Sequence, residues 1–213
     1  MDLVIVGAGG LGREMYSWIS QEIKEKPNYK INGFIDDNLN ALDKFDYPVK
    51  VIGTIADYWP KSEEELVLSI LNPETKKRIV KSLSQRGAEF YRLIHPTSII
   101  GTNVKIGKGC IICPNCVLTN DVTLGDFIFI NITSTIGHDT IIGDFTSING
   151  NVHITGRVKI GKECLFGVGA KVIPGRRIGD NVVVGAGSVV IRNVHSNVTV
   201  FGNPAKKVYI RKK

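Results

Sequence analysis

The chain has 213 residues, of which 43% are hydrophobic and 22% charged, and its net charge is +7. That length accommodates one domain or two small ones with a real core, and the composition is that of an ordinary globular protein. Even the longest apolar stretches are short, such as residues 65–70, and the N-terminus lacks a basic leader, so we expect a cytoplasmic protein that spans no membrane.

The first 95 residues predict alternating strands and helices. Residues 3–19 indicate a buried strand, a glycine turn and an amphipathic helix, and residues 30–37 indicate a second strand. Weaker signals predict strands near 49–53, at 66–70 and at 89–94, and helices near 54–59 and over 73–87. This alternation predicts a small parallel sheet of the doubly wound, Rossmann-like type.

The turn after the first strand reads GAGGLG at residues 7–12, which matches the pattern G-x-G-x-x-G. Such glycines let the backbone approach a phosphate, and the helix that follows offers free N–H groups. The predicted ligand contacts here are Gly9, Gly10, Leu11 and Gly12, together with Asp36 and Asp37 at the end of the second strand. A tight turn beside a polar strand end is the alternative. Because 95 residues supply about one mononucleotide-binding half, a mononucleotide or a nucleotide sugar fits better than a redox dinucleotide.

From residue 100 onward an apolar side chain recurs at every sixth position. The series is Ile100, Ile106, Ile112, Leu118, Leu124, Ile130, Ile136, Ile142, Ile148, Ile154, Ile160, Phe166, Val172, Ile178, Val184 and Val190. This period predicts a parallel β-helix in which three six-residue repeats, each a strand and a corner, make one coil. Residues eighteen apart then stack. The stacked glycines at 107, 125, 143, 161 and 179 indicate a corner with special backbone angles or a close approach.

His95-Pro96 marks the expected passage between the two parts, since the residue before a proline disfavours helix. We therefore predict a nucleotide-sugar-binding domain over 1–95, a β-helix over 96–194 and a basic tail over 195–213. His95 itself is interpreted as structural.

Cysteines and charge also follow the repeat. Cys110, Cys116 and Cys164 occupy its small position, which favours packing over the metal or iron–sulfur site that C-x-x-C-x-x-C suggests; only Cys113 lies elsewhere. From Arg157 onward there are 12 Lys/Arg against two acidic residues, whereas the preceding 156 residues carry 15 basic and 18 acidic groups. Such a cationic end suits a polyanionic small ligand or nucleic acid.

The chain resembles a known family over essentially its whole length. The resemblance rests on residues 7–12, GFIDD at 33–37, HPTSIIG at 95–101, GAGSVV at 185–190 and GNPAKKV at 202–208. The chain is similar to the nucleotide-sugar N-acetyltransferases that act on 4-amino-4,6-dideoxy sugars. These enzymes belong to the left-handed β-helix hexapeptide-repeat acyltransferase superfamily and are related to the sialic acid O-acetyltransferase group. The resemblance implies a homotrimer that binds acetyl-CoA between neighbouring solenoids, uses no metal and no nucleic acid, and serves surface polysaccharide or glycan biosynthesis.

The resemblance also implies site residues. His138 would be the general base with Asp139 beside it, Asn131 would touch the sugar, and acetyl-CoA would be bound by Ser147, Gly156, Val168, Ala186 and Lys206, with Lys207 a further candidate. Ser147 departs from the pattern, because some members have a second histidine there. An imidazole titrates in the range that proton removal from an attacking amine requires. Neighbours on a strand point to opposite faces, so Asp139 helps His138 only if the pair sits at a corner.

Alternatives remain at this point. O-acetylation of a sialic acid or similar sugar is an activity of the same class, and a non-catalytic trimeric sugar-nucleotide-binding scaffold is another reading. His153 lacks an adjacent acidic residue, and His195 lies in the loop after the last repeat. A zinc site of the β-helical carbonic anhydrase kind needs closely spaced histidines, and the nearest two here, His138 and His153, are fifteen residues apart.

Overall fold

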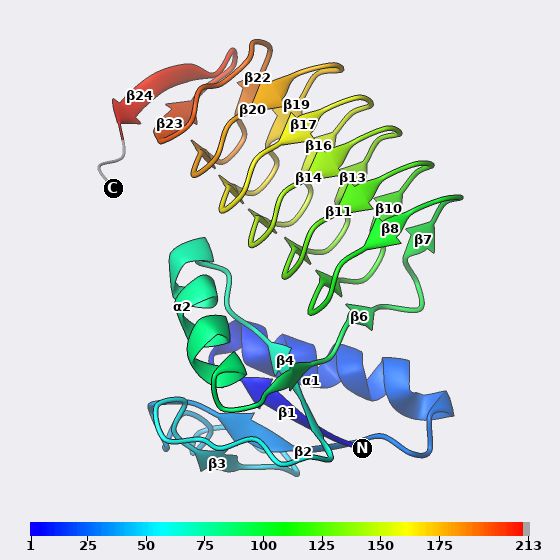
Figure 1. Cartoon of the computed structure of the whole chain (residues 1–213), viewed down its shortest axis with the longest axis vertical. Coiled ribbons are helices and arrows are strands. Elements are labelled where there is room, and N and C mark those ends of the chain that lie inside the picture. The colour runs from blue at the N-terminus through cyan, green and yellow to red at the C-terminus, as the bar shows by residue number, and fades with distance from the viewer. Residues whose placement is uncertain (211–213) are drawn as a thin grey trace. The chain divides into compact units, whose positions relative to one another are not determined.

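The structure is a computed structural model that describes the backbone of residues 1–210 and the side chains of residues 1–209. The chain divides into two compact units, one that ends at Pro96 and one that begins at Thr97 (Figure 1). Arg211, Lys212 and Lys213 of the predicted basic tail lie outside the described residues. Among the residues described, no helix combines the length and the apolar character needed to cross a membrane.

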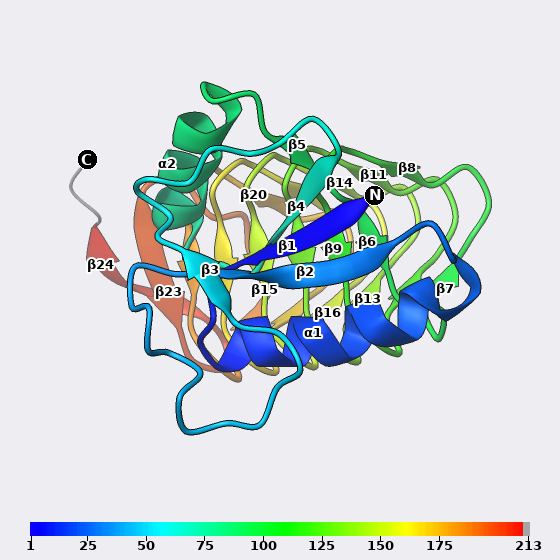
Figure 2. The ribbon, with the colours of Figure 1, turned by 90° about the horizontal axis from the view of Figure 1, so that it is seen from below.

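The first unit is built on a parallel sheet. Its elements are β1 (Asp2–Val6), α1 (Gly10–Glu22), the short 3-10 helix η1 (Ile23–Glu25), β2 (Lys30–Ile35), β3 (Val51–Gly53), β4 (Glu64–Leu68), α2 (Pro73–Ser84), β5 (Glu89–Phe90) and β6 (Leu93–Ile94). The strand order is β3-β2-β1-β4-β5, and each neighbouring pair is parallel. Figure 2 shows β2, β1 and β4 side by side. The predicted Rossmann-like α/β domain is confirmed.

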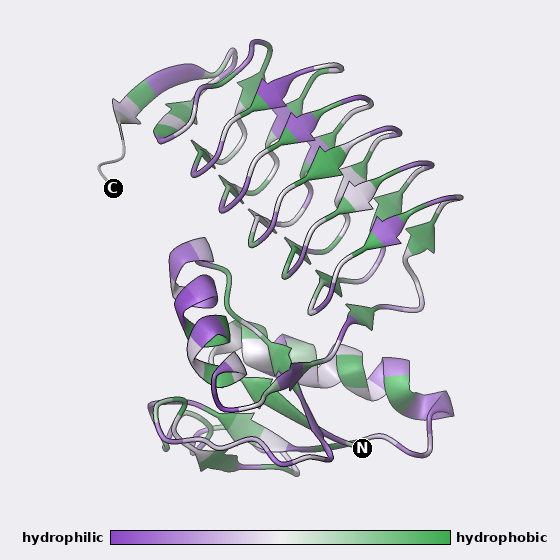
Figure 3. Cartoon of the chain, in the orientation of Figure 1, coloured by the Kyte–Doolittle hydropathy of each residue, from purple (hydrophilic) through white to green (hydrophobic). Residues whose placement is uncertain are grey.

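Burial explains why these strands form. Leu3, Val4, Ile5 and Val6 of β1 are fully buried, as an internal parallel strand requires. Helix α2 begins where the side chain of Asn72 accepts a hydrogen bond from Thr75 N–H at 2.9 Å, with Pro73 in the first turn. Figure 3 shows the apolar character of β1 and β4.

One predicted helix of this unit is wrong. Residues 54–59 form turns and irregular backbone instead. Asp37 Oδ1 accepts hydrogen bonds from Ile55 N–H at 3.0 Å and Ala56 N–H at 3.3 Å, and Thr54 Oγ1 accepts one from Asp57 N–H at 3.1 Å. These side-chain acceptors satisfy the backbone locally, so a single turn forms and Pro60 follows it.

The second unit is the predicted left-handed parallel β-helix, seen as a stack of coils in Figure 1. Its coil strands are β7 (Ile99–Ile100), β8 (Lys105–Ile106), β9 (Ile111–Ile112), β10 (Val117–Leu118), β11 (Thr123–Leu124), β12 (Phe129–Ile130), β13 (Thr135–Ile136), β14 (Ile141–Ile142), β15 (Ser147–Ile148), β16 (His153–Ile154), β17 (Lys159–Ile160), β18 (Leu165–Phe166), β19 (Lys171–Val172), β20 (Arg177–Ile178), β21 (Val183–Val184) and β22 (Val189–Val190). β23 (Val198–Phe201) and β24 (Lys206–Ile210) follow as an antiparallel pair, within the segment predicted as a tail.

Three parallel sheets form the sides of this prism, and each strand pairs with the strand eighteen residues away, as Ile136 pairs with Leu118 and Ile154. We name them by their middle strands: the β13 sheet (β22-β19-β16-β13-β10-β7), the β14 sheet (β20-β17-β14-β11-β8) and the β15 sheet, which includes β21-β18-β15-β12-β9. The predicted apolar series points inward: Ile136, Ile148 and Phe166 are fully buried, although Ile100 in the first repeat is 36% exposed.

The glycine column serves close approach rather than special backbone angles. A Cβ on Gly125 would lie 2.3 Å from Asp144 Oδ1, and one on Gly161 would lie 2.2 Å from Asp180 Oδ1. The left-handed backbone falls two positions later, for example at Phe127 with φ 56° and Phe145 with φ 60°. The coils therefore pack too tightly at this corner for a side chain at the glycine positions.

Candidate functional site

His138 and Asp139 occupy a corner of the β-helix, between β13 and β14. Asp139 has a left-handed backbone with φ 58°, a conformation that recurs at the same place in the other corners and that aspartate tolerates better than most residues. The corner therefore turns both side chains outward, and they are 53% and 57% exposed. Asp139 can help His138 only if the two residues lie at a corner, and the structure places them at one.

The two side chains are joined by a short contact, His138 Nδ1 to Asp139 Oδ2 at 2.7 Å. When Nδ1–H donates to this carboxylate, the proton is held on Nδ1 and Nε2 is left as the acceptor. A carboxylate at this distance also stabilises the imidazolium that forms when Nε2 takes up a proton. The pair can therefore act as an oriented general base.

Gly156 lies directly against the imidazole, one coil further along the solenoid. A Cβ at Gly156 would lie 2.5 Å from His138 Nε2, 2.7 Å from Cε1 and 2.9 Å from Cδ2. Arg157 N–H donates to the carbonyl of His138 at 2.7 Å, which ties the two corners together. Any side chain at position 156 would therefore displace the His138 ring, so Gly156 is part of the candidate site.

Other residues predicted from the resemblance lie elsewhere on the solenoid. Asn131, Val168 and Ala186 lie at the corner between the β15 and β13 sheets. Val168 is 58% exposed, and a Cβ on Gly167 would meet Ala186 N at 2.5 Å. Asn131 Oδ1 accepts a hydrogen bond from Ile132 N–H at 2.8 Å. Within one chain, this corner is separate from that of His138.

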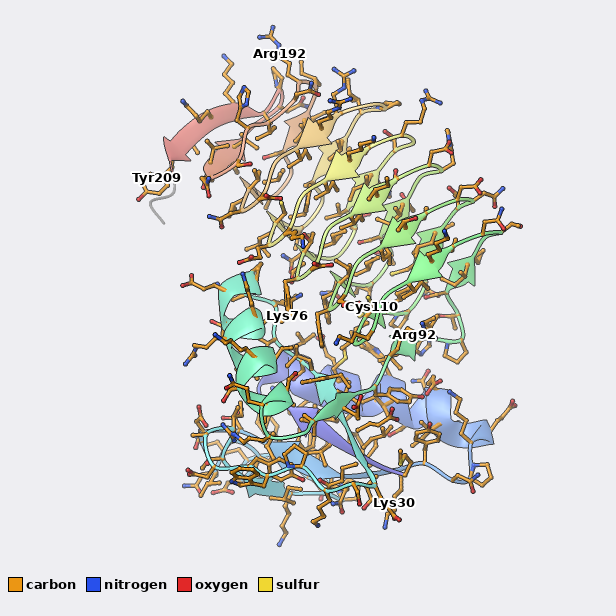
Figure 4. The ribbon with its side chains drawn as sticks, viewed as in Figure 1. Lys30, Lys76, Arg92, Cys110, Arg192 and Tyr209 are labelled. Atoms are coloured by element: carbon orange, nitrogen blue, oxygen red, sulfur yellow. The ribbon has the colours of Figure 1, made fainter. Side chains whose placement is uncertain are left out.

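Ser147 and Lys206 are not brought to the His138 corner either. Ser147 is fully buried in β15, in register with Phe129 and Leu165. Lys206 begins β24 and is exposed, opposite Phe201. Figure 4 shows this C-terminal end of the solenoid, with Arg192 and Tyr209 projecting from it.

The glycine turn of the first unit is shaped for close approach. Gly9 is the N-cap of α1 and has no side chain to cap it, which leaves first-turn N–H groups for an anion. A Cβ on Gly9 or Gly10 would meet no atom within 4 Å, so the space above the turn is open. Gly12 instead packs inward, since its Cβ would lie 1.9 Å from the carbonyl oxygen of Gly7.

Asp36 and Asp37 are engaged by the backbone around this turn. Asp36 Oδ2 accepts from Ala8 N–H at 2.7 Å and Oδ1 accepts from Asn38 N–H at 2.8 Å. Asp37 Oδ1 holds the turn at residues 55–56 described above. Both carboxylates therefore shape the loops, in addition to the ligand contacts predicted for them.

Two features of this unit were missed from the sequence. The guanidinium of Arg13, in the first turn of α1, lies over the Phe45 ring with 3.7 Å between its carbon and the ring centroid. Phe45 and Tyr47 line a cavity of about 290 Å³ together with Leu39 and Leu42. The aromatic residues in the loop after the paired aspartates were the available signal.

The cationic half of the chain, from Arg157 onward, contains a cavity that the sequence did not predict. Lys159 and Arg177 are neighbours in register on β17 and β20, and they line a cavity of about 500 Å³ with His195 and Ser196. The stacking of residues eighteen apart was the signal, because it brings these two cations together.

The cysteines follow the packing interpretation. Cys110, Cys113, Cys116 and Cys164 are not disulfide-bonded, and all four are fully buried; Cys110 is labelled in Figure 4. Burial raises the pKa of Cys116 and of Cys164 to about 11. Within the described residues, no group of three or more His, Cys, Asp or Glu side chains is placed to hold a metal ion.

Both units match known protein families. Residues 2–83 match the PglD N-terminal domain, and residues 157–192 match the hexapeptide repeat of succinyl-transferase. The acetyltransferase domain of PglB from Neisseria gonorrhoeae, solved with acetyl coenzyme A, is 26% identical with a TM-score of 0.88, covering 97% of this chain and 98% of that one. WeeI from Acinetobacter baumannii is 26% identical with a TM-score of 0.87, covering 98% and 100%.

Among curated proteins, GDP-perosamine N-acetyltransferase of Escherichia coli is 30% identical over 112 residues, 52% of this chain and 50% of the relative. The match to a putative acetyltransferase of Saccharomyces cerevisiae spans 26% of that relative's length. The chain thus aligns with half or less of these curated relatives, while it matches the two solved structures from end to end. A match to the PglD N-terminal domain is thus joined, in one chain, to a match to the hexapeptide repeat of succinyl-transferase, and the fold is similar to that of a solved acetyltransferase domain over nearly the whole chain.

Proposed function

We propose that this protein transfers the acetyl group of acetyl-CoA to the 4-amino group of a nucleotide-linked 4-amino-4,6-dideoxy sugar, with His138 as the general base. The observation that carries the proposal is the His138–Asp139 contact of 2.7 Å on the corner packed against Gly156. The likeness to a PglB domain solved with acetyl coenzyme A supports the choice of co-substrate.

The proposed chemistry uses the free imidazole nitrogen. The amine nitrogen attacks the thioester carbonyl carbon, and His138 Nε2 takes the proton that this nitrogen loses. Asp139 holds Nδ1–H and stabilises the imidazolium. The C–S bond then breaks, and the imidazolium returns the proton to the departing CoA thiolate. The base is therefore ready for the next cycle.

The distribution of the candidate residues supports a site completed by a second copy. His138 and Gly156 lie at one corner of the prism, whereas Asn131, Val168 and Ala186 lie at another. A groove lined by both groups requires the corner of a neighbouring solenoid, as in the homotrimer that the family resemblance implies. Acetyl-CoA would lie along this groove, with its phosphates near the cationic half that includes Lys206.

In the first unit the uncapped start of α1 and the open space over Gly9 and Gly10 support binding of the nucleotide diphosphate. The relative named GDP-perosamine N-acetyltransferase makes a GDP-linked amino sugar the first substrate to assay, followed by the UDP- and dTDP-linked sugars. A product of this kind serves surface polysaccharide or glycan assembly.

The test measures CoA thiol release and the mass of the sugar product for each nucleotide sugar, with free sialic acid as the O-acetylation arm. We expect one amino sugar to be N-acetylated and H138A to lower kcat by about 100-fold or more. H153A is the matched control, because His153 lies at the next coil and its Nδ1 contacts Thr135 Oγ1 at 2.9 Å rather than a carboxylate. No turnover of any amino sugar, or full activity in H138A, would overturn the proposal; binding without turnover would favour the scaffold.

A further inference from the structure

The coil that carries His138 has a hydroxyl at each of its three corners. Ser134, Thr140 and Thr146 occupy the small position of the repeat, and each is fully buried. The coils before and after have Val122 and Val158 in the column of Thr140. A valine fills the same space without a polar group, so the buried hydroxyl of Thr140 is not required by packing.

Thr140 Oγ1 brackets the corner on which the imidazole rests. It donates to the carbonyl of Thr155 at 3.1 Å and accepts from Val158 N–H at 3.3 Å. These two atoms stand at either end of the corner formed by residues 155–158, whose Gly156 lies against the His138 ring. The hydroxyl therefore joins the strand after His138 to both ends of the surface beneath the ring.

We infer that Thr140 is a positioning residue: its buried hydroxyl fixes the Gly156 corner beneath His138, and thereby the place of Nε2. The inference rests on the proposed role of His138 as base. Without the two hydrogen bonds, Thr155 and Val158 lose a shared partner, and the corner between them gains freedom to shift relative to the ring. A catalytic group displaced by a fraction of an ångström loses rate while substrate binding is retained.

The other two hydroxyls provide matched controls within the same coil. Thr146 Oγ1 donates to Gly161 O at 3.1 Å and accepts from Cys164 N–H at 3.1 Å. Ser134 Oγ makes the corresponding bonds to Asn149 O at 2.9 Å and Val152 N–H at 3.1 Å. Both side chains make the same kind of bridge as Thr140, but at corners that do not carry His138. Ser134 lies at the corner of Asn131, so the loss of the Thr146 bridge is the one that reports the structural value of such a bridge alone.

The experiment compares T140V, T146V and T140S in the full chain. We expect T140V and T146V to lower Tm by similar amounts, and only T140V to lower kcat, by about tenfold with little change in KM. T140S keeps the hydroxyl and should restore kcat. Should T140V fail to fold, T140A is the second variant, since alanine occupies the same small position at Ala170.

An independent readout is the ¹⁵N chemical shifts of the His138 imidazole, followed through a pH titration. We expect T140V to shift the tautomer signal, and T146V to leave it unchanged. Equal kcat in T140V and T146V, or unmoved imidazole signals in T140V, would overturn the inference. Full activity in H138A would overturn the proposed function instead, and the imidazole signals would still decide whether Thr140 positions the ring.

Discussion

Replacing Gly156 with alanine is the sharpest test of the site, because the structure gives the size of the disturbance. A Cβ at this position would lie 2.5 Å from His138 Nε2, and ordinary contact begins at about 3.4 Å, so the nitrogen must move by about 0.9 Å. Misplacing a reacting group by about 1 Å costs about 100-fold in rate, or about 2.7 kcal/mol of transition-state stabilisation. We therefore expect G156A to lower kcat by about 100-fold.

The fold should survive this substitution. Gly156 does not have a left-handed backbone, and the atoms that the Cβ would meet belong to the outer end of an exposed side chain, which can rotate away. A glycine-to-alanine change at such a position stabilises a chain by about 0.4–1 kcal/mol through its unfolded state, which offsets the displaced ring. Tm should therefore change little.

The assay is steady-state acetyl transfer with acetyl-CoA and the nucleotide sugar each varied. G150A is the matched control, since its Cβ would meet Ile132 atoms at 3.5 Å, an ordinary contact. Gly156 is also a predicted cofactor contact, and a rise in KM for acetyl-CoA with unchanged kcat would assign it to binding alone. A kcat equal to that of G150A would refute the argument that the ring must stay where Gly156 allows it.

Three further outcomes are expected. D36A should lose about 2 kcal/mol of stability in urea unfolding, because the carboxylate of Asp36 accepts charge-assisted hydrogen bonds from Ala8 and Asn38 N–H; unchanged stability would show that the glycine turn stands without it. Burial lowers the pKa of His95, so the unfolded chain takes up a proton that the folded chain does not as the pH falls below its ordinary value of about 6.5. Stability should therefore decline in that direction, and a Tm profile equally steep in H95Q would exclude His95 as the cause. The native thiols, with the pKa of Cys116 and Cys164 raised to about 11 by burial, should react with Ellman's reagent at pH of about 8 only after unfolding.

The β-helix was predictable because one short rule governs it. The six-residue series sets each inward side chain, and buried Ile136, Ile148 and Phe166 follow it. The rule weakens at the solenoid's end, where Ile100 is 36% exposed because its strand has a coil neighbour on one side only. Long, strictly periodic segments carry their own fold, since each repeat constrains the next.

The short elements of the first unit were harder to predict. The helix expected near residues 54–59 is a turn because Asp37, eighteen residues earlier, accepts the Ile55 N–H. Local propensity contains no information about that partner. The helix over 73–87 was predicted correctly in kind and ends at Ser84, where its last turn unwinds.

For the candidate site, the sequence predicts the His138–Asp139 pair but not the packing that holds it. Nothing in the residue order reveals that the imidazole rests on Gly156 or that Thr140 bridges the corner beneath it. Those contacts join neighbouring coils, so they follow from the stacking distance and side-chain directions. The contact between Arg13 and Phe45 was not predicted for a similar reason, because a loop far along the chain from Arg13 brings the two side chains together.

Because strands eighteen residues apart pair with each other, the position of a residue along the chain determines the side of the prism on which it lies. A six-residue insertion ahead of His138 would carry it to the next corner, whereas an eighteen-residue insertion would return it to the same corner one coil further along. Both insertions leave Gly156 eighteen residues after His138 and so beneath the ring, but only the second keeps the pair at the same corner as seen from the coils that precede it. Insertions and deletions in such a chain are therefore tolerated in steps of eighteen residues. Whole coils can be added or removed at the ends, whereas a fraction of a coil inserted before the site would place His138 on a different face of the solenoid.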